Sequence, residues 1–350
     1  MTPGRSLHRS VWTFVASLLL LAAAGAHLPA QAVTDEASSC STKAGSTTPF
    51  YGKPSASGVY DGTFTAGVPL AHGLINNRYT PQGLASWPNW DGHGEDVLLV
   101  SAYRDPGATT SKDPRYEKVS AVYGIVASGT RTGTSLGRML LDTEAHVGGL
   151  AVSDGYLYVA VSRSIVSYPL GTVRNVLDAG NTNALNSGTT AGTSTFTIGF
   201  LGSGDGRLWA GDFDEDEDTT LSSYAAAGAG GALGPAVDTK QVVPRKTQGV
   251  AVTSAYTIFS TSFGRHDESN LWVVPRNQQT LTDARSYCFS APSMSEGLAV
   301  LGDTLYVSFE SGAYTYTKNK KNLPRNVITD THRAPLAAVT GLYTSRPAHP

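Results

Sequence analysis

Several residue types and motifs are scarce or missing in this chain of 350 residues. It has two cysteines and three methionines, and only 15% of its residues are charged, whereas glycine occurs 38 times. Long charged helical patterns are absent, so the composition is typical of an all-β protein rich in turns. The formal net charge of −2 excludes the basic surface with which proteins bind nucleic acid.

Common catalytic motifs are absent as well. The sequence contains no Gly-x-Ser-x-Gly elbow, no His-Glu-x-x-His pair and no Walker loop. The histidines His93, His146 and His266 lack the tight spacing of metal ligands. Motifs of these kinds therefore assign no reaction to the chain.

The sequence repeats one pattern five times. In its clearest copy, Gly297-Leu298-Ala299-Val300 precedes the turn Leu301-Gly302-Asp303, and a run rich in β-branched and aromatic residues follows from Leu305 to Phe309. The pattern reads as strand, tight turn, strand. The aligned glycines are Gly83, Gly149, Gly199, Gly249 and Gly297, with spacings of 66, 50, 50 and 48 residues.

Two further strand candidates follow in each unit. The third strands are expected at Ser120–Ala127, Ile165–Tyr168, Thr220–Tyr224, Asn270–Val274 and Ala313–Thr317. The fourth strands are expected at Gly137–Leu141, Val173–Asp178, Val237–Val243, Arg285–Ser290 and Arg325–Ile328. Four strands in about 40–50 residues is the period of a β-propeller blade. We therefore predict an all-β, five-bladed propeller over residues 64–343, with four-stranded antiparallel blades around a central channel; a β-sandwich is the alternative.

Two terminal segments compete to close the ring. A strand within residues 64–76 or one within residues 336–343 could complete the last blade, and the sequence does not choose between them. Residues 179–195 and 225–234 are poor in apolar side chains and are expected to form surface loops.

Residues 1–32 have the features of a secretory signal peptide. A basic start precedes the apolar core Val11–Ala24, and Ala30-Gln31-Ala32 supplies the small residues that signal peptidase requires. The core is too short for a membrane anchor of about 20 apolar residues. We expect a secreted, extracellular protein without a membrane span, with an irregular segment at 33–63 and a tail at 344–350.

The two cysteines form an even pair. Export places Cys40 and Cys288 in an oxidising compartment, where such a pair predicts one disulfide. Two free thiols or an intermolecular bridge are the alternatives.

Polar residues are expected to gather at one end of the channel. Strands of a blade alternate in direction, so the start of each first strand and the end of each second strand lie on one face, here called the mouth. The candidate ligand-binding residues there are Gln82, Arg104, Arg163, Asp212, Gln248, Arg265, Glu296 and Glu310. Mutual neutralisation of the arginines and carboxylates for structural purposes is the alternative.

Acidic residues at the mouth supply candidates for catalysis and for metal binding. Glu296, Glu310 and Asp212 could form the carboxyl pair that glycosidases use as acid and base. Asp212, Asp214 and Asp216 alternate as in calcium loops, but the residues that would follow in an EF-hand do not match. A solvated acidic loop is the alternative; no cofactor is required, and calcium is the metal that such a site would take.

Units four and five resemble a family of secreted bacterial proteins. The runs that carry the resemblance are Gln248-Gly249-Val250-Ala251, Ser260 to Arg265, Ala291 to Gly297, and Leu305 to Ala313. The resemblance implies a secreted propeller. It implies no activity, because the family is mostly uncharacterised. Sugar-lactonase and phytase-like propellers are similar at a greater distance, but their metal ligands and catalytic motifs have no counterparts in this sequence.

Three functions follow from these observations. The first is a non-catalytic binding module, expected to be a monomer, that presents the mouth to a sugar, a cell-wall polymer or a partner protein. The second is a secreted hydrolase of glycosides, lactones, esters or phosphoesters, with paired carboxylates and calcium assistance. The third is a structural or interaction protein with an inert mouth.

Overall fold

The protein divides into two compact units, Met1–Asp35 and Glu36–Pro350. A computed structural model describes residues 58–70, 73–105, 118–180, 183–225, 229–281 and 285–345, all in the second unit. Strands dominate these residues, and none of their helices is long and apolar enough to cross a membrane.

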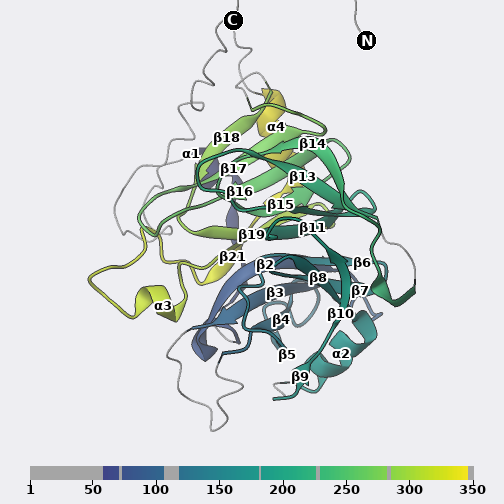
Figure 1. Ribbon diagram of the computed structural model, residues 1–350. Helices are drawn as coiled ribbons and strands as arrows, with labels where there is room; N and C mark the ends of the chain where they lie inside the picture. The colour runs from purple at the N-terminus through teal and green to yellow at the C-terminus, as the bar shows by residue number, and fades with distance from the viewer. Residues whose placement is uncertain are drawn as a thin grey trace, which may run out of the picture. The chain divides into compact units, whose positions relative to one another are not determined.

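Five antiparallel sheets are arranged around a common axis, which confirms the five-bladed propeller (Figure 1). The first blade contains β2 (Tyr79–Trp87), β3 (Val97–Arg104), β4 (Ala121–Val126) and β5 (Ser135–Leu141), with β9 (Leu185–Asn186) added in parallel at its edge. The second contains β6 (Leu150–Ser153), β7 (Tyr156–Val161), β8 (Ser164–Pro169) and β10 (Thr189–Thr193). The third contains β11 (Phe200–Gly204), β12 (Arg207–Gly211), β13 (Thr219–Tyr224) and β14 (Val237–Val243). The fourth contains β15 (Thr247–Val252), β16 (Tyr256–Thr261), β17 (Ser269–Pro275) and β18 (Tyr287–Ala291), and the fifth β19 (Ser295–Leu301), β20 (Thr304–Phe309), β21 (Asp330–Pro335) and β1 (Thr65–Pro69).

The first strand of each unit is the innermost strand of its blade. The inner strands β2, β6, β11, β15 and β19 each contact the next, and β19 contacts β2 again. The repeated glycines lie where these strands meet: a Cβ atom on Gly149 would overlap the backbone of Leu201, and one on Gly297 would overlap the backbone of Leu84. Only glycine allows two backbones to approach so closely, which explains the repeated pattern.

The N-terminal strand closes the ring. β1 pairs with β21 and forms the outer edge of the fifth blade. The alternative at residues 336–343 is wrong, because α4 (Leu336–Ser345) is a helix. Joining the two ends of the propeller in one sheet leaves fewer open edges for other chains to pair with.

Three of the expected outer strands are wrong. Val173–Asp178 lies in the helix α2 (Leu170–Asp178), which begins directly after Pro169 and buries Val173 and Leu177 one turn apart. The fourth strand of that blade is instead β10, within the segment expected to be a loop; its Thr and Gly residues give little apolar signal.

The fifth blade differs in the same way. Ala313–Thr317 contains the short helix α3 (Tyr314–Thr317), and Arg325–Ile328 forms no strand. The third strand is β21, a polar segment whose buried residues include Thr331 and His332. Residues 310–329 thus make a long excursion between β20 and β21 (Figure 1).

Apolar side chains fill the middle of the channel. Residues of all five inner strands, among them Leu84, Leu150, Val250 and Leu298, line a narrow cavity on the axis. The larger apolar clusters lie between neighbouring blades; one, for example, joins Leu298 and Phe309 of the fifth blade to Leu271 and Phe289 of the fourth.

Candidate functional site

Two glutamates of the fifth blade come together at the mouth. Ser295 pairs with Phe309, so Glu296 enters the inner strand beside the point where Glu310 leaves the second strand. A β-bulge interrupts the pairing between Ser295 and Leu298 and contains Glu296. Bulges re-aim side chains. Matching bulges occur at Gln82 in β2 and next to Gln248 in β15, which are the positions equivalent to Glu296.

The carboxylate of Glu310 is held by an amide and a hydroxyl. Gln82 Nε2 donates to Glu310 Oε2 at 3.2 Å, and the Tyr316 hydroxyl donates to the same oxygen at 3.1 Å. The hydroxyl of Tyr103 lies 3.4 Å from that of Tyr316. Blades one and five therefore share one polar network at the mouth.

Glu296 has a different environment, although it is the more deeply buried of the two glutamates. It is 2% exposed, and no hydrogen bond or ion pair with a described residue reaches its carboxyl group. Burial, and then the charge of Glu310, raise its pKa well above the usual range of a glutamate. Burial and the neighbouring carboxylate therefore both favour the protonated form of Glu296.

The pKa of Glu310 lies closer to neutrality. Burial raises it to about 7, while the hydrogen bonds from Tyr316 and Gln82 and the charge of Arg265 act in the opposite direction. Burial, with the added charges of Glu310 and Glu296, raises the pKa of Tyr103 to about 12 and raises that of Tyr316 too. All four groups thus interact, and the two tyrosines remain hydroxyl donors at any ordinary pH.

Arg265 contributes to the site without pairing directly with either glutamate. Its guanidinium group lies 5.2 Å from the centre of the Tyr316 ring and donates to the Asn322 carbonyl at 3.1 Å. Within the described part of the chain, no arginine or lysine is within ion-pair distance of Glu296 or Glu310. The structure therefore does not show the neutralisation that was the alternative for these carboxylates.

The excursion between β20 and β21 places Tyr316 beside Glu310. It is fastened to the fourth blade by His266 Nε2 with Asn322 Oδ1 (2.7 Å) and by Arg325 Nη2 with Glu268 Oε1 (2.6 Å). Tyr316 was missed as a site residue because its segment resembles a strand. The only available signal was its short distance along the chain from Glu310.

The remaining predicted ligand-binding residues lie around this centre but not within it. Gln248 donates to the Ser262 carbonyl at 3.5 Å, and Arg104 donates to the Asn77 carbonyl at 2.7 Å while it lies over the Tyr79 ring. The charge of Arg163 lowers the pKa of Asp212, although burial raises that pKa by more. The hydrogen bonds of Gln248 and Arg104 thus go to backbone carbonyl groups, and Arg163 acts on Asp212.

The acidic loop after β12 is organised by its own backbone. Asp214 Oδ1 accepts hydrogen bonds from the amides of Asp216 (2.8 Å) and Glu217 (2.9 Å), and these bonds lower the pKa of Asp214. Among the described residues, no group of three or more His, Cys, Asp or Glu side chains could hold a metal ion. Calcium at Asp212, Asp214 and Asp216 stays a prediction.

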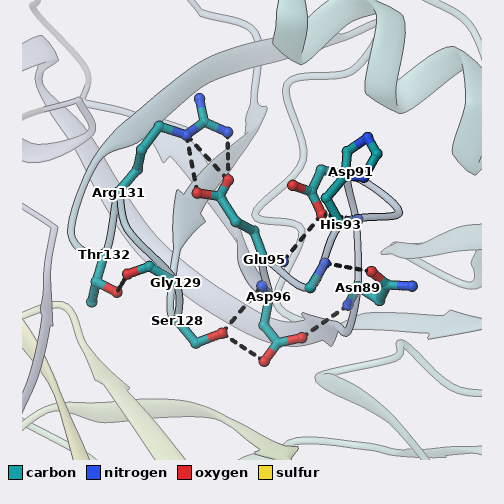
Figure 2. Close-up of polar contacts among 10 residues, drawn as sticks. Asn89, Asp91, His93, Glu95, Asp96, Ser128, Gly129, Arg131 and Thr132 are labelled. Atoms are coloured by element: carbon teal, nitrogen blue, oxygen red, sulfur yellow. Dashed lines mark hydrogen bonds and ion pairs between the residues drawn. The ribbon is translucent and has the colours of Figure 1, made fainter.

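The opposite end of the first blade carries a second polar cluster. The loop between β2 and β3 contains Asp91, His93 and Glu95, and Figure 2 shows Glu95 facing Arg131. Arg131 Nε lies 3.1 Å from Glu95 Oε2, and Asp91 Oδ1 accepts from the amides of His93 and Glu95. His93 thus lies away from the mouth, because this loop leaves the first strand and enters the second.

The proposed disulfide involves a position that the structure does not describe. Cys288 is buried in β18 opposite Trp272, whereas Cys40 lies outside the described residues. The signal peptide at 1–32 and most of the irregular segment at 33–63 also lie outside them. The bridge and the export signal remain predictions.

Comparisons with known proteins assign no family. No family model and no curated protein matches the chain. Among solved structures, hydrazine synthase of Kuenenia stuttgartiensis is 9% identical over 68% of this chain and 57% of that one, with a TM-score of 0.37. The N-terminal domain of Nup159 is 10% identical over 78% and 63%, with a TM-score of 0.31. A GH43_1 enzyme from Xanthomonas citri is 12% identical over 79% and 92%, with a TM-score of 0.40.

The chain spans less than two thirds of the first two of these structures. Likeness at these identities and TM-scores assigns no activity, so the functional argument rests on the chain's own residues.

Proposed function

We propose that this chain is a secreted propeller that binds a hydroxyl-rich ligand, a sugar or a cell-wall polymer, at the mouth. The observation that carries this proposal is the buried residue Glu296 at the mouth, whose carboxyl group has no hydrogen bond with a described residue. A carboxyl group without a protein partner at a channel mouth can bond a ligand.

The surrounding groups suit a sugar. Glu310 offers acceptor oxygens, Gln82 an amide, and Tyr103 and Tyr316 hydroxyl groups and ring faces. A few convergent polar groups among aromatic side chains are typical of small-molecule sites. A sugar presents alternating hydroxyl groups and apolar ring faces that match this combination.

Acid–base catalysis on the same ligand is the second candidate. The observation that favours it is the carboxyl pair itself, in which burial raises the pKa of Glu296 well above its usual range and that of Glu310 to about 7. Two carboxyl groups whose pKa values are separated by their environment can act as general acid and general base near neutral pH. Glycoside, lactone, ester or phosphoester hydrolysis would use Glu296 and Glu310 in these roles.

Binding measurements on matched variants test the first proposal. We expect Glu296→Gln and Glu310→Gln to weaken binding of sugars found on a glycan array by about 30-fold or more, as for central residues of binding sites. Glu95→Gln removes a carboxylate at the opposite end of the first blade and is expected to bind like the unaltered protein. Loss of binding only in variants with a disturbed fold, or equal binding by all four proteins, would refute the proposal.

A substrate screen tests the second candidate. Glycosides, lactones, esters and phosphoesters are incubated with the unaltered protein and with both glutamine variants at several pH values. Turnover that disappears in both variants supports the catalytic role, and absence of turnover in all four classes eliminates it.

Export, the Cys40–Cys288 bridge and a monomeric state belong to the same proposal. Peptide mapping under non-reducing conditions, after free thiols have been blocked, is expected to recover the two cysteine peptides linked. Recovery of both as alkylated thiols would contradict the bridge and weaken the argument for an oxidising compartment.

A further inference from the structure

Aromatic side chains lie on the mouth side of all five blades. Phe213 follows β12, Phe263 follows β16, Tyr316 follows β20 and Tyr103 lies near the end of β3, while His146 precedes β6. Each residue comes from the mouth side of a different blade, and Tyr316 belongs to the helix α3 within the excursion. We name this set the aromatic arc.

Phe213 and Phe263 form the part of the arc that the glutamate site does not use. Their ring centres are 6.4 Å apart, with an angle of 38° between the ring planes. Phe263 is 45% exposed, which makes it one of three exposed large apolar side chains among the described residues. An exposed aromatic ring beside a polar site is a feature of ligand-binding surfaces.

The backbone around this pair is fixed by hydrogen bonds. The Lys246 amide donates to the Asp214 carbonyl at 2.6 Å, and the Ser262 amide donates to the Lys246 carbonyl at 2.9 Å. These bonds join the loops that carry Phe213 and Phe263. The two rings therefore form a pre-organised surface, which lowers the entropic cost of binding.

Polar groups border the rings on both sides. Lys246 Nζ lies 5.5 Å from the centre of the Phe263 ring, and Asp212 and Asp214 adjoin Phe213 in sequence. Donors and acceptors beside a ring face suit the hydroxyl groups of a sugar. The run Asp212–Asp218 holds six acidic residues, and this concentration of negative charge would repel an anionic polymer.

Arg265 links this surface to the glutamates through its contact with Tyr316. It follows Phe263 by two residues, and its guanidinium group stacks on Tyr316, whose hydroxyl donates to Glu310. A ligand that reaches from Glu310 to Phe263 would thus pass along Arg265. A ligand that contacts both places would be a chain of sugar rings.

We propose that Phe213 and Phe263 form a second subsite, which binds a neutral polysaccharide where it extends beyond Glu296 and Glu310. This inference rests on the proposed function, since it assigns the length and charge of the ligand of that site. A monosaccharide or disaccharide at the glutamates would leave the second subsite empty.

Affinity as a function of ligand length tests the proposal. Calorimetry uses the whole protein with neutral hexasaccharides and disaccharides of glucose, xylose, mannose and N-acetylglucosamine. We expect Phe263→Ala to weaken binding of the preferred hexasaccharide about tenfold, from the size of aromatic contacts, and to leave disaccharide binding unchanged. Phe263→Trp is expected to keep hexasaccharide binding.

Val237→Ala is the matched control. Val237 is also a large exposed apolar residue (49%), but it begins β14 at the end of the third blade opposite the mouth. Equal hexasaccharide affinities of Phe263→Ala and the unaltered protein would refute the second subsite and leave the proposed function standing. Tighter binding of polygalacturonate than of neutral chains would refute the neutral ligand. If no sugar of either length binds, both this inference and the proposed function are wrong.

Discussion

The two polar clusters of the propeller treat a buried glutamate in opposite ways. At the far end of the first blade, Glu95 is 9% exposed and receives hydrogen bonds from Arg131, which lower its pKa. At the mouth, Glu296 and Glu310 lie beside one another without an ion-pair partner among the described residues, and both pKa values are raised. The first arrangement stabilises an ionised carboxylate in the folded protein, whereas the second destabilises it.

This difference distinguishes a cluster that satisfies its own charges from one that does not. The loop between β2 and β3 satisfies its own charges through Arg131, Ser128 and backbone amides (Figure 2). The mouth brings two carboxyl groups together. This arrangement costs stability unless one of them is protonated or a ligand is bound. Functional sites often give up stability in this way.

The largest expected effect is a change in the pH dependence of stability at the mouth. Because folding raises the pKa of Glu310 from 4.5 to about 7, the folded state holds more protons than the unfolded state between these values. Its contribution therefore favours folding at low pH and is lost as the pH rises. In Glu310→Gln that loss should disappear, so the variant should gain about 3 kcal/mol relative to the unaltered protein between pH 4 and pH 8.

Chemical unfolding at a series of pH values measures this difference. Subtracting the two curves removes the contributions of titrating groups that do not interact with Glu310. A difference that stays constant across the range would show that Glu310 titrates normally, and the contrast between the two clusters would then lose its basis.

The sequence predicted the inner part of the molecule better than the outer part. Gly83, Gly149, Gly249 and Gly297 are required where backbones of inner strands meet, so their repetition records the blade count directly. Outer strands such as β10 and β21 lack this constraint, and their polar composition resembles that of loops. The excursion that replaced an expected strand after Glu310 is equally hard to see, because Tyr314 to Thr317 contains aromatic and β-branched residues.

The candidate site shows the same contrast: residues on the repeated strands were predicted, and a residue outside them was missed. Glu296, Glu310 and Gln82 are fixed by the strand repeat, and the structure brings them together as their positions imply. Tyr316 depends on the fold of an irregular segment, and no repeat announces it. Gln248 occupies the position equivalent to Glu296, but its side chain donates to the Ser262 carbonyl of its own blade. A pattern of sequence positions cannot predict that bond.

A smaller effect of opposite sign is expected at the far-end cluster. Folding lowers the pKa of Glu95, so its contribution to stability is present above pH 4.5 and is lost as the pH falls through the folded-state value. Glu95→Gln should therefore be less stable than the unaltered protein at pH 7, and the difference should shrink as the pH falls below 4.5. Glu144→Gln replaces an exposed glutamate and serves as the control in the same unfolding series. A Glu95→Gln protein as stable as the control at pH 7 would contradict the structural role of the pair.

The smallest expected effect concerns one hydrogen bond at the mouth. The Tyr316 hydroxyl donates to Glu310 Oε2 at 3.1 Å and thereby holds the pKa of Glu310 below the value that burial alone would give. Tyr316→Phe removes this donor and keeps the ring against Arg265, so the pKa of Glu310 should rise further. Titration of the Glu310 carboxyl carbon by NMR measures the shift.

Tyr314→Phe is the matched control, because Tyr314 belongs to the same helix, is 39% exposed and has no hydroxyl hydrogen bond with any described residue. Equal titration midpoints in the two variants would show that Tyr316 does not tune Glu310. A higher midpoint in Tyr316→Phe alone would establish that the excursion, and not only the blades, sets the protonation state of the mouth.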